Sequence, residues 1–239
     1  MFYANVRPQG LKEFLLQPGH DQLKELLLHN TGETDFLDFK WKWIDFTKMA
    51  KHILAIANSG GGCIIVGVNQ TDDGKILIDG LSEREFLDKA DVDNKLENLL
   101  PKYLKYHTED FIFSKRTHAL LQGKRFQVLV IEYDPKYVPY TSTITRGELT
   151  YGAIYVRQGT KSIEASKDKL VEIILRKAES GGSDYHELSL KDHLMQLKEL
   201  YEEVNAQPNA GYTEFVTDMI EKKKHKIQSL LDLQSEKDV

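Results

Sequence analysis

Cysteine is nearly absent from this sequence of 239 residues, in which Cys63 is the only one. One cysteine excludes an internal disulfide and any metal site built from several cysteines. The spacings HxxxH and CxxC, which are typical of zinc sites, do not occur in the sequence. We therefore expect an apolar core to stabilise the fold, with Cys63 as a small buried member of it.

Long apolar runs are also lacking, because no stretch approaches the roughly 18 apolar residues that a membrane-spanning helix needs. The first residues, MFYANVRPQGLKEF, have neither the charged start nor the apolar stretch of a signal peptide. A hydrophobic content of 41% and a charged content of 29% are those of an ordinary globular protein. These features predict a cytoplasmic protein that has no membrane partner.

An excess of positive charge is lacking too, since the net charge is −5, whereas nucleic-acid-binding domains are usually basic. The acidity has one source. The residues after 180 contain 12 Asp and Glu against 7 Lys, which accounts for the whole net charge. The first 180 residues are therefore neutral overall, and their composition does not exclude an anionic ligand.

A change of pattern at residues 179–187, ESGGSDYHE, marks a candidate linker. Before it, strand-like and helix-like runs alternate, whereas after it apolar residues recur at the helical spacing of three and four. The sequence predicts an α+β domain over 1–180, with a mixed, largely antiparallel sheet and flanking helices. It also predicts an acidic helical hairpin over 185–239, which packs on the domain or joins copies into a homo-oligomer.

The stretch ETDFLDFKWKW, residues 33–43, places charged and aromatic residues close together. In a strand the aromatic residues fall on one face, which we expect to be core, and the charged residues fall on the outward face. The two sets are Phe39, Trp41 and Trp43, and Asp38, Lys40 and Lys42. Either the charged set is an ordinary surface with weak cross-strand pairs, or it is a site.

The glycines of ANSGGGCIIVGV, residues 57–68, resemble a phosphate loop at first sight. A phosphate loop runs from a strand through glycines to a helix whose N–H groups meet the anion. Here the glycines follow a predicted helix and precede a predicted strand, so the nearby helix end offers carbonyl groups. We therefore expect a helix C-cap followed by close packing of the chain, and no nucleotide cofactor.

Four motifs in order carry a family resemblance. They are Glu33, the triplet Asp38-Phe39-Lys40, the helix end AIANSGGG with the strand IIVGV, and IYVRQGTKSIEAS with Tyr155, Arg157 and Gly159. Over about residues 32–177 the sequence resembles the Schlafen AlbA_2 domain, a domain also described as divergent AAA-4 and as DNA-binding. The resemblance implies a protein that binds nucleic acid, either DNA or RNA, in a regulatory or defence role.

The resemblance also implies a second function, that of a divalent-metal-dependent endoribonuclease acting on tRNA or rRNA. Two positions of the family's acidic triad are acidic here, whereas the third falls on Asn69 and Gln70. The implied ion is Mg²⁺ or Mn²⁺, which prefers oxygen ligands. The candidate catalytic residues are Glu33, Asp38 and Lys40, and the candidate metal ligands are Glu33, Asp38, Asp72 and Asp73.

Basic and aromatic residues supply the candidate contacts to nucleic acid. The phosphate-binding candidates are Lys42, Lys48, Lys51, Arg157 and Lys161, with a second cluster at Lys115, Arg116, Lys124 and Arg125. Arg157 is the strongest, because the family strand carries arginine there and a guanidinium suits phosphate. The candidates for base stacking are Tyr103, Tyr106, Tyr137 and Tyr140. Binding is the first prediction, RNA cleavage the second, and an inactive interaction or dimerisation scaffold the third.

Overall fold

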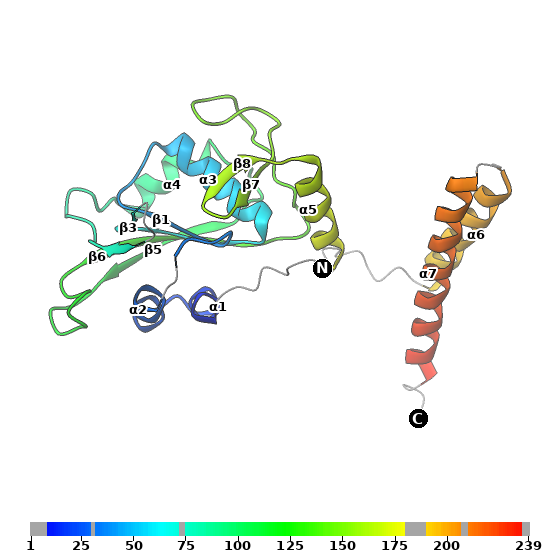
Figure 1. Ribbon diagram of the computed structural model, residues 1–239, viewed down its shortest axis with the longest axis horizontal. Coiled ribbons are helices and arrows are strands. Elements are labelled where there is room, and N and C mark those ends of the chain that lie inside the picture. Colours follow the sequence, from blue (N-terminus) through cyan, green and yellow to red (C-terminus); the bar gives the residue numbers. More distant parts are fainter. Residues whose placement is uncertain (1–8, 30–31, 72–74, 180–189, 207–209, 236–239) are drawn as a thin grey trace. The chain divides into compact units, whose positions relative to one another are not determined.

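The computed structural model describes residues 9–29, 32–71, 75–179, 190–206 and 210–235. The chain divides into two compact units, residues 1–182 and 183–239. The first unit is an α+β domain, which confirms the predicted fold class, and the second contains two helices (Figure 1). None of the helices in the described residues combines the length and the apolar character that a membrane crossing requires.

The elements of the first unit alternate between helices and strands along the chain. The helices are α1 (Gln9–Leu16), α2 (His20–Leu28), α3 (Phe46–Ser59), α4 (Lys89–Glu97) and α5 (Lys167–Glu179). The strands are β1 (Leu37–Lys40), β2 (Gly62–Val66), β3 (Val68–Gln70), β4 (Ile76–Ile78), β5 (Tyr106–Ile112), β6 (Arg125–Ile131), β7 (Tyr155–Gln158) and β8 (Lys161–Glu164). The second unit consists of α6 (Leu190–Ala206) and α7 (Ala210–Ser235).

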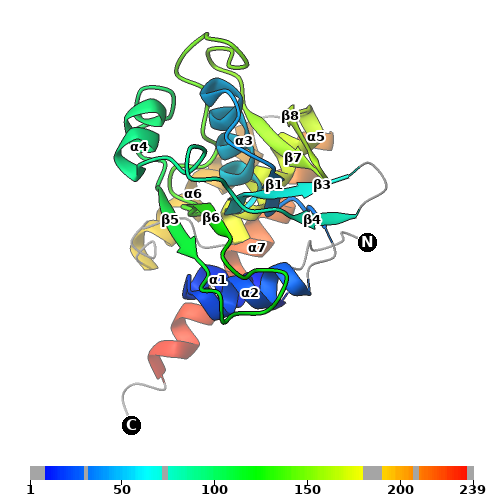
Figure 2. The same ribbon diagram turned by 90° about the vertical axis from the view of Figure 1, so that its left-hand side faces the viewer.

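Four strands form the central sheet in the order β1-β2-β6-β5. β1 and β2 are parallel, whereas β6 is antiparallel to both β2 and β5. The sheet is therefore mixed and largely antiparallel, as the sequence predicts. Two separate hairpins, β3–β4 and β7–β8, complete the strands (Figure 2).

Helices cover both faces of the central sheet (Figure 1). α1 and α2 pack on one face, which Cys63 and Ile65 of β2 share. α3 packs on the opposite face, which Ile64 and Val66 share. Because both faces are covered, every residue of β2 is buried. Side chains alternate in the same way along β1, so Asp38 and Lys40 point to the face on which α3 packs.

The glycines after α3 end the helix and allow close packing, as the sequence predicts. Gly60 is the C-cap with φ of 119°, in the left-handed region, and Gly61 N donates to Ile56 O at 2.9 Å. At Gly62 an added Cβ would lie 2.0 Å from Phe36 O. Glycine at this position therefore lets β2 approach the chain that leads into β1.

The predicted aromatic face of residues 33–43 is only partly correct. β1 ends at Lys40, and Trp41 is 54% exposed because the alternation stops where the strand ends. Trp43 packs with the apolar cluster around α3, whereas Phe39 packs on the opposite face of the sheet with the cluster of α1 and α2. The predicted outward position of Asp38 is also wrong. Arg157 of β7 and His52 of α3 lie close to Asp38 on that face, and the carboxylate is buried.

The second unit is a pair of packed helices, so the predicted C-terminal helices are present. α6 and α7 pack against each other. Val216, Ile220 and Ile227 of α7 are buried. The side chain of Lys223 donates to Gln196 Oε1 and so links the two helices through a polar contact. Residues 207–209, between α6 and α7, lie outside the described residues.

Candidate functional site

The two carboxylates that the sequence predicts to form a site are held around β1. Glu33 lies in the turn before the strand, and its Oε1 accepts a hydrogen bond from Phe39 N at 3.0 Å. The backbone N–H of Glu33 donates to Gln70 Oε1 at 2.9 Å, which ties this turn to β3. Asp38 lies in β1 itself, with a side chain that is 1% exposed. The structure therefore brings both carboxylates to one face of the sheet.

Arg157 reaches these carboxylates from β7, which packs along α3. Its Nη1 lies 3.0 Å from Asp38 Oδ1, and its Nη2 lies 3.9 Å from Glu33 Oε2. Its backbone N–H donates to Ser59 Oγ at 2.8 Å, at the end of α3. The side chain is fully buried. Arg157 therefore faces the carboxylates, unlike the exposed phosphate ligand that the sequence predicts.

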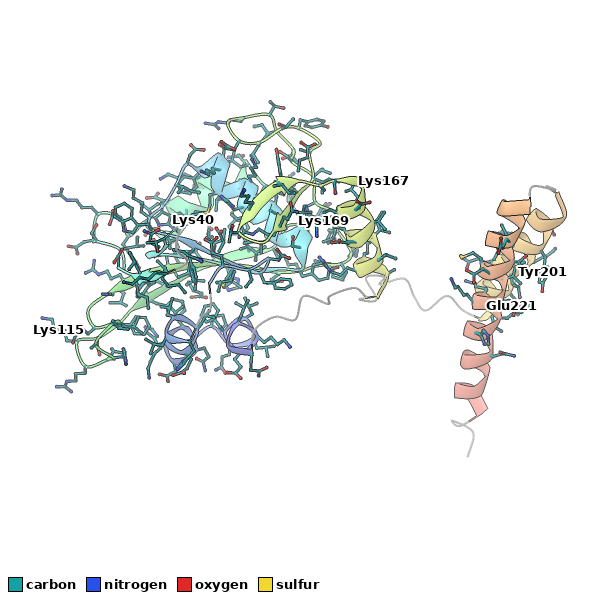
Figure 3. All side chains as sticks on the ribbon, in the orientation of Figure 1. Lys40, Lys115, Lys167, Lys169, Tyr201 and Glu221 are labelled. Carbon is teal, nitrogen blue, oxygen red and sulfur yellow. The ribbon has the colours of Figure 1, made fainter. Side chains whose placement is uncertain are left out.

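Lys40 completes the group from the end of β1 (Figure 3). Its Nζ contacts Asp38 Oδ2 and donates to Phe39 O at 3.1 Å. Its side chain is 15% exposed, so it lies at the solvent edge of the group. We refer to Glu33, Asp38, Lys40 and Arg157 as the charged cluster. With all four groups ionised, its two negative and two positive charges cancel.

The environment of the charged cluster raises the pKa of Glu33. Burial raises the pKa of Glu33 above its ordinary value, and the charge of Asp38 raises it further. The hydrogen bond from Phe39 N and the positive charges of Lys40 and Arg157 act in the opposite direction. The Asp38–Arg157 pair is close but poorly aligned, since Asp38 Oδ1 and Arg157 Nε have no hydrogen-bond partner among the described residues.

The charged cluster does not fit the divalent cation that the family resemblance implies. The unused bonding capacity of Asp38 Oδ1 is the one feature that favours a further ligand. However, Lys40 and Arg157 already contact both oxygens of Asp38, and a divalent cation beside them meets two positive charges. The described residues contain no group of three His, Cys, Asp or Glu able to hold a metal. Asp72 and Asp73 lie outside the described residues.

His52 of α3 lies beside the charged cluster and is buried. Its Nδ1 lies 2.8 Å from Ser162 Oγ of β8, within hydrogen-bonding distance. Burial lowers the pKa of His52 from its ordinary value of 6.5 to about 4. Asp38 opposes this shift, whereas the charges of Lys40 and Arg157 add to it. His52 is therefore a neutral packed residue near neutral pH.

The depressed pKa of His52 makes stability depend on pH. Since the unfolded chain binds this proton at higher pH, stability is lost as pH falls from 6.5 toward 4. Between pH 7 and pH 5 we expect a loss of about 2 kcal/mol from this group. Urea unfolding of His52→Gln should show a correspondingly smaller loss than the unchanged chain. The exposed His107→Gln serves as control, and equal pH dependence in all three proteins would contradict the prediction.

Three of the predicted phosphate ligands, Lys42, Lys48 and Lys161, are exposed. Lys48 lies one helical turn before His52, and Lys161 directly precedes Ser162, so both border the His52–Ser162 contact. Within the part of the chain that the structure describes, no carboxylate lies at ion-pairing distance from these three lysines. They are therefore available to an anion.

Other predicted cations are engaged within the protein or lie elsewhere. Lys51 Nζ lies 3.1 Å from Glu148 Oε2, and Arg125 Nη1 lies 3.6 Å from Glu83 Oε1. The loop between β5 and β6, which carries Lys115, lies apart from the charged cluster (Figure 3). The second predicted cluster therefore does not extend the surface of Lys48 and Lys161.

Two residues to which the sequence pattern assigned no role in the site hold it together. Gln70 occupies a position where the family pattern is acidic, and its amide fixes the Glu33 turn. Asn58 Nδ2 donates to Tyr140 O and Tyr155 O, each at 2.9 Å, and its Oδ1 accepts from Tyr140 N at 2.7 Å. The sequence feature that indicates a structural role for Asn58 is its place in the motif AIANSGGG, where a polar residue lies at the end of an apolar helix.

Comparison with known proteins places these residues in one matched region. A family model described as Schlafen, AlbA_2 matches residues 33–166. The match begins at Glu33 and includes Asp38, Arg157 and Ser162, so it contains the whole charged cluster. No curated protein matches the chain.

Proposed function

The chain belongs to the Schlafen AlbA_2 family, and on that premise we propose that its first unit binds nucleic acid through phosphate contacts. The observation that carries the proposal is that some cations pair with buried carboxylates while others are exposed to solvent. Lys40 and Arg157 neutralise the buried carboxylates, whereas Lys48 and Lys161 are exposed with no carboxylate at ion-pairing distance among the described residues. Exposed lysines beside a neutral interior attract a polyanion with little opposing charge.

Lys42 belongs to the same proposed surface, in the chain segment between β1 and α3. Its Nζ lies 5.0 Å from the centroid of the exposed Trp41 ring. A cation next to an exposed aromatic face suits a ligand that combines phosphates with flat bases. The regulatory or defence role that the family resemblance implies depends on such binding and is part of the same proposal.

The proposal is tested by measuring affinity for labelled tRNA and for a DNA duplex over a range of salt concentrations. Affinity should fall steeply with salt, since phosphate contacts release counterions. Lys48→Ala combined with Lys161→Ala should weaken binding and lower the salt slope by about one for each lysine. Lys12→Ala, an exposed lysine of α1 on the opposite side of the sheet, is the matched control. An unchanged slope in the double variant would contradict the assignment of this surface.

RNA cleavage is the competing function, and the same labelled tRNA distinguishes it from binding. We expect binding without cleavage, because the charged cluster is already balanced by Lys40 and Arg157. Incubation of tRNA with Mn²⁺, beside an EDTA sample and Glu33→Ala, provides the check. Metal-dependent cutting that disappears in Glu33→Ala would overturn the expectation. A chain that neither binds nor cuts would support a scaffold function instead.

A further inference from the structure

Two stacked tyrosines lie outside the charged cluster, on the loops that follow α4 and β6. The ring centroids of Tyr103 and Tyr137 are 4.6 Å apart and their planes are inclined by 3°. Tyr103 is 62% exposed even though one face of its ring rests on Tyr137. The face of Tyr103 that points away from Tyr137 is therefore open to solvent.

The two loops are fixed by backbone contacts and by a buried anchor. Glu132 N donates to Lys105 O at 3.0 Å, which joins the end of β6 to the chain before β5. Tyr140 Oη donates to Tyr103 O at 3.3 Å, and Leu104, the next residue, is buried. The ring of Tyr103 thus stands on a supported backbone, and a ligand that stacks on it needs little reordering of the protein.

Lysines lie around the stacked pair, together with Glu132 and Asp134 on the loop after β6. Lys102 and Lys105 flank Tyr103 in the sequence and are exposed, and Lys136 Nζ lies 5.6 Å from the Tyr137 ring centroid. Lys177 Nζ donates to Val138 O at 2.8 Å and adds a fourth cation near this loop. Asp134 offsets part of this charge, at 3.9 Å from Lys105 Nζ. The combination of an open aromatic face with nearby lysines is that of a base-stacking surface.

We propose that Tyr103, supported by Tyr137, stacks on a base of single-stranded nucleic acid while Lys102 and Lys136 contact the adjoining phosphates. Duplexes are poor ligands for this site, because their bases are already paired and stacked. The inference rests on the proposed function and deepens it, since it names single strands as the preferred ligand and adds a second contact surface.

The test compares binding of 20-nucleotide oligo(U) and oligo(dU) with binding of a DNA duplex of the same length. Tyr103→Ala should weaken single-strand affinity by about 5- to 100-fold and leave duplex affinity unchanged. Tyr103→Trp should retain the affinity, since it preserves a stacking face. Tyr151→Ala removes another exposed tyrosine, 73% exposed in the loop before β7, and should have no effect. The two oligonucleotides show whether the ribose or deoxyribose backbone is preferred.

The outcomes separate this inference from the function on which it rests. If the unchanged chain binds single strands and Tyr103→Ala binds them equally well, the stacking site is wrong and nucleic-acid binding stands. If the unchanged chain binds neither single strands nor duplex at low salt, both are overturned. Equal losses for single strands and duplex, or a loss in Tyr103→Trp as large as in Tyr103→Ala, would also overturn the stacking site. Photocrosslinking of 5-iodouracil-substituted oligonucleotides should map to Tyr103, and a map elsewhere would contradict it.

Discussion

Replacement of Arg157 by alanine is expected to lower the free energy of unfolding by about 3–5 kcal/mol. The guanidinium is fully buried, 3.0 Å from Asp38 Oδ1 and 3.9 Å from Glu33 Oε2. Its removal leaves two carboxylates in the interior with only Lys40 to balance them. Such a loss is much larger than the net contribution of the pair, because it is dominated by the uncompensated charge that stays buried. Urea unfolding monitored by circular dichroism provides the measurement.

Two further variants identify the cause of the Arg157 effect. Arg116→Ala, which removes an exposed arginine in the loop between β5 and β6, should change stability by less than about 0.5 kcal/mol. Asp38→Asn combined with Arg157→Ala should be more stable than Arg157→Ala alone, since it removes the stranded charge. A loss below about 1 kcal/mol in Arg157→Ala would contradict the prediction, because it would mean that water or a shift of Lys40 compensates the carboxylates.

Replacement of Asn58 by alanine is expected to cost about 3 kcal/mol or more. Its amide makes three hydrogen bonds of 2.7–2.9 Å to the backbones of Tyr140 and Tyr155, and no part of the residue is exposed. Each buried backbone group that loses its partner costs about 1–3 kcal/mol. Since Tyr155 begins β7, the change also weakens the support of Arg157. Chemical unfolding gives the size of the loss.

A substitution at the same site tests the chemistry of the Asn58 contacts. Asn58→Asp keeps the shape and the acceptor for Tyr140 N but places a carboxylate against the two carbonyl groups, so it should be at least as destabilising as alanine. Asn98→Ala, at the exposed C-cap of α4, is the control and should have a small effect. A stable Asn58→Asp protein would show that the amide donors contribute little.

The fold was predictable where short-range patterns decide it. The helical spacing of apolar residues and the glycines that follow predicted α3 and its end, and the continuous apolar run predicted the buried strand β2. β8 was not predicted, because its four residues, KSIE, have no clear alternation and are ordered by pairing with β7. β5 runs from Tyr106 to Ile112 through several polar residues, because pairing with β6 orders the strand beyond its apolar residues.

The candidate site was predictable in composition but not in arrangement. Alternation correctly put Asp38 and Lys40 on one face of β1, yet it holds no information on what covers that face. The burial of Asp38 depends on α3 and β7, and β7 lies more than a hundred residues further along the chain. The family resemblance identified Arg157, but only the packed structure shows that its guanidinium is matched with carboxylates and not exposed to a ligand.

The burial of the charged cluster also makes dissolved salt a selective probe of this protein. Mobile ions screen charges that face the solvent over about 10 Å at 0.1 M, whereas pairs enclosed by protein are screened much less. Arg157 and Asp38 are enclosed in this way, with side chains at most 1% exposed. Moderate changes of ionic strength should therefore leave the shape of the domain and its internal pairing unchanged. A change of nucleic-acid affinity with ionic strength then reports on the exposed lysines and not on the charged cluster.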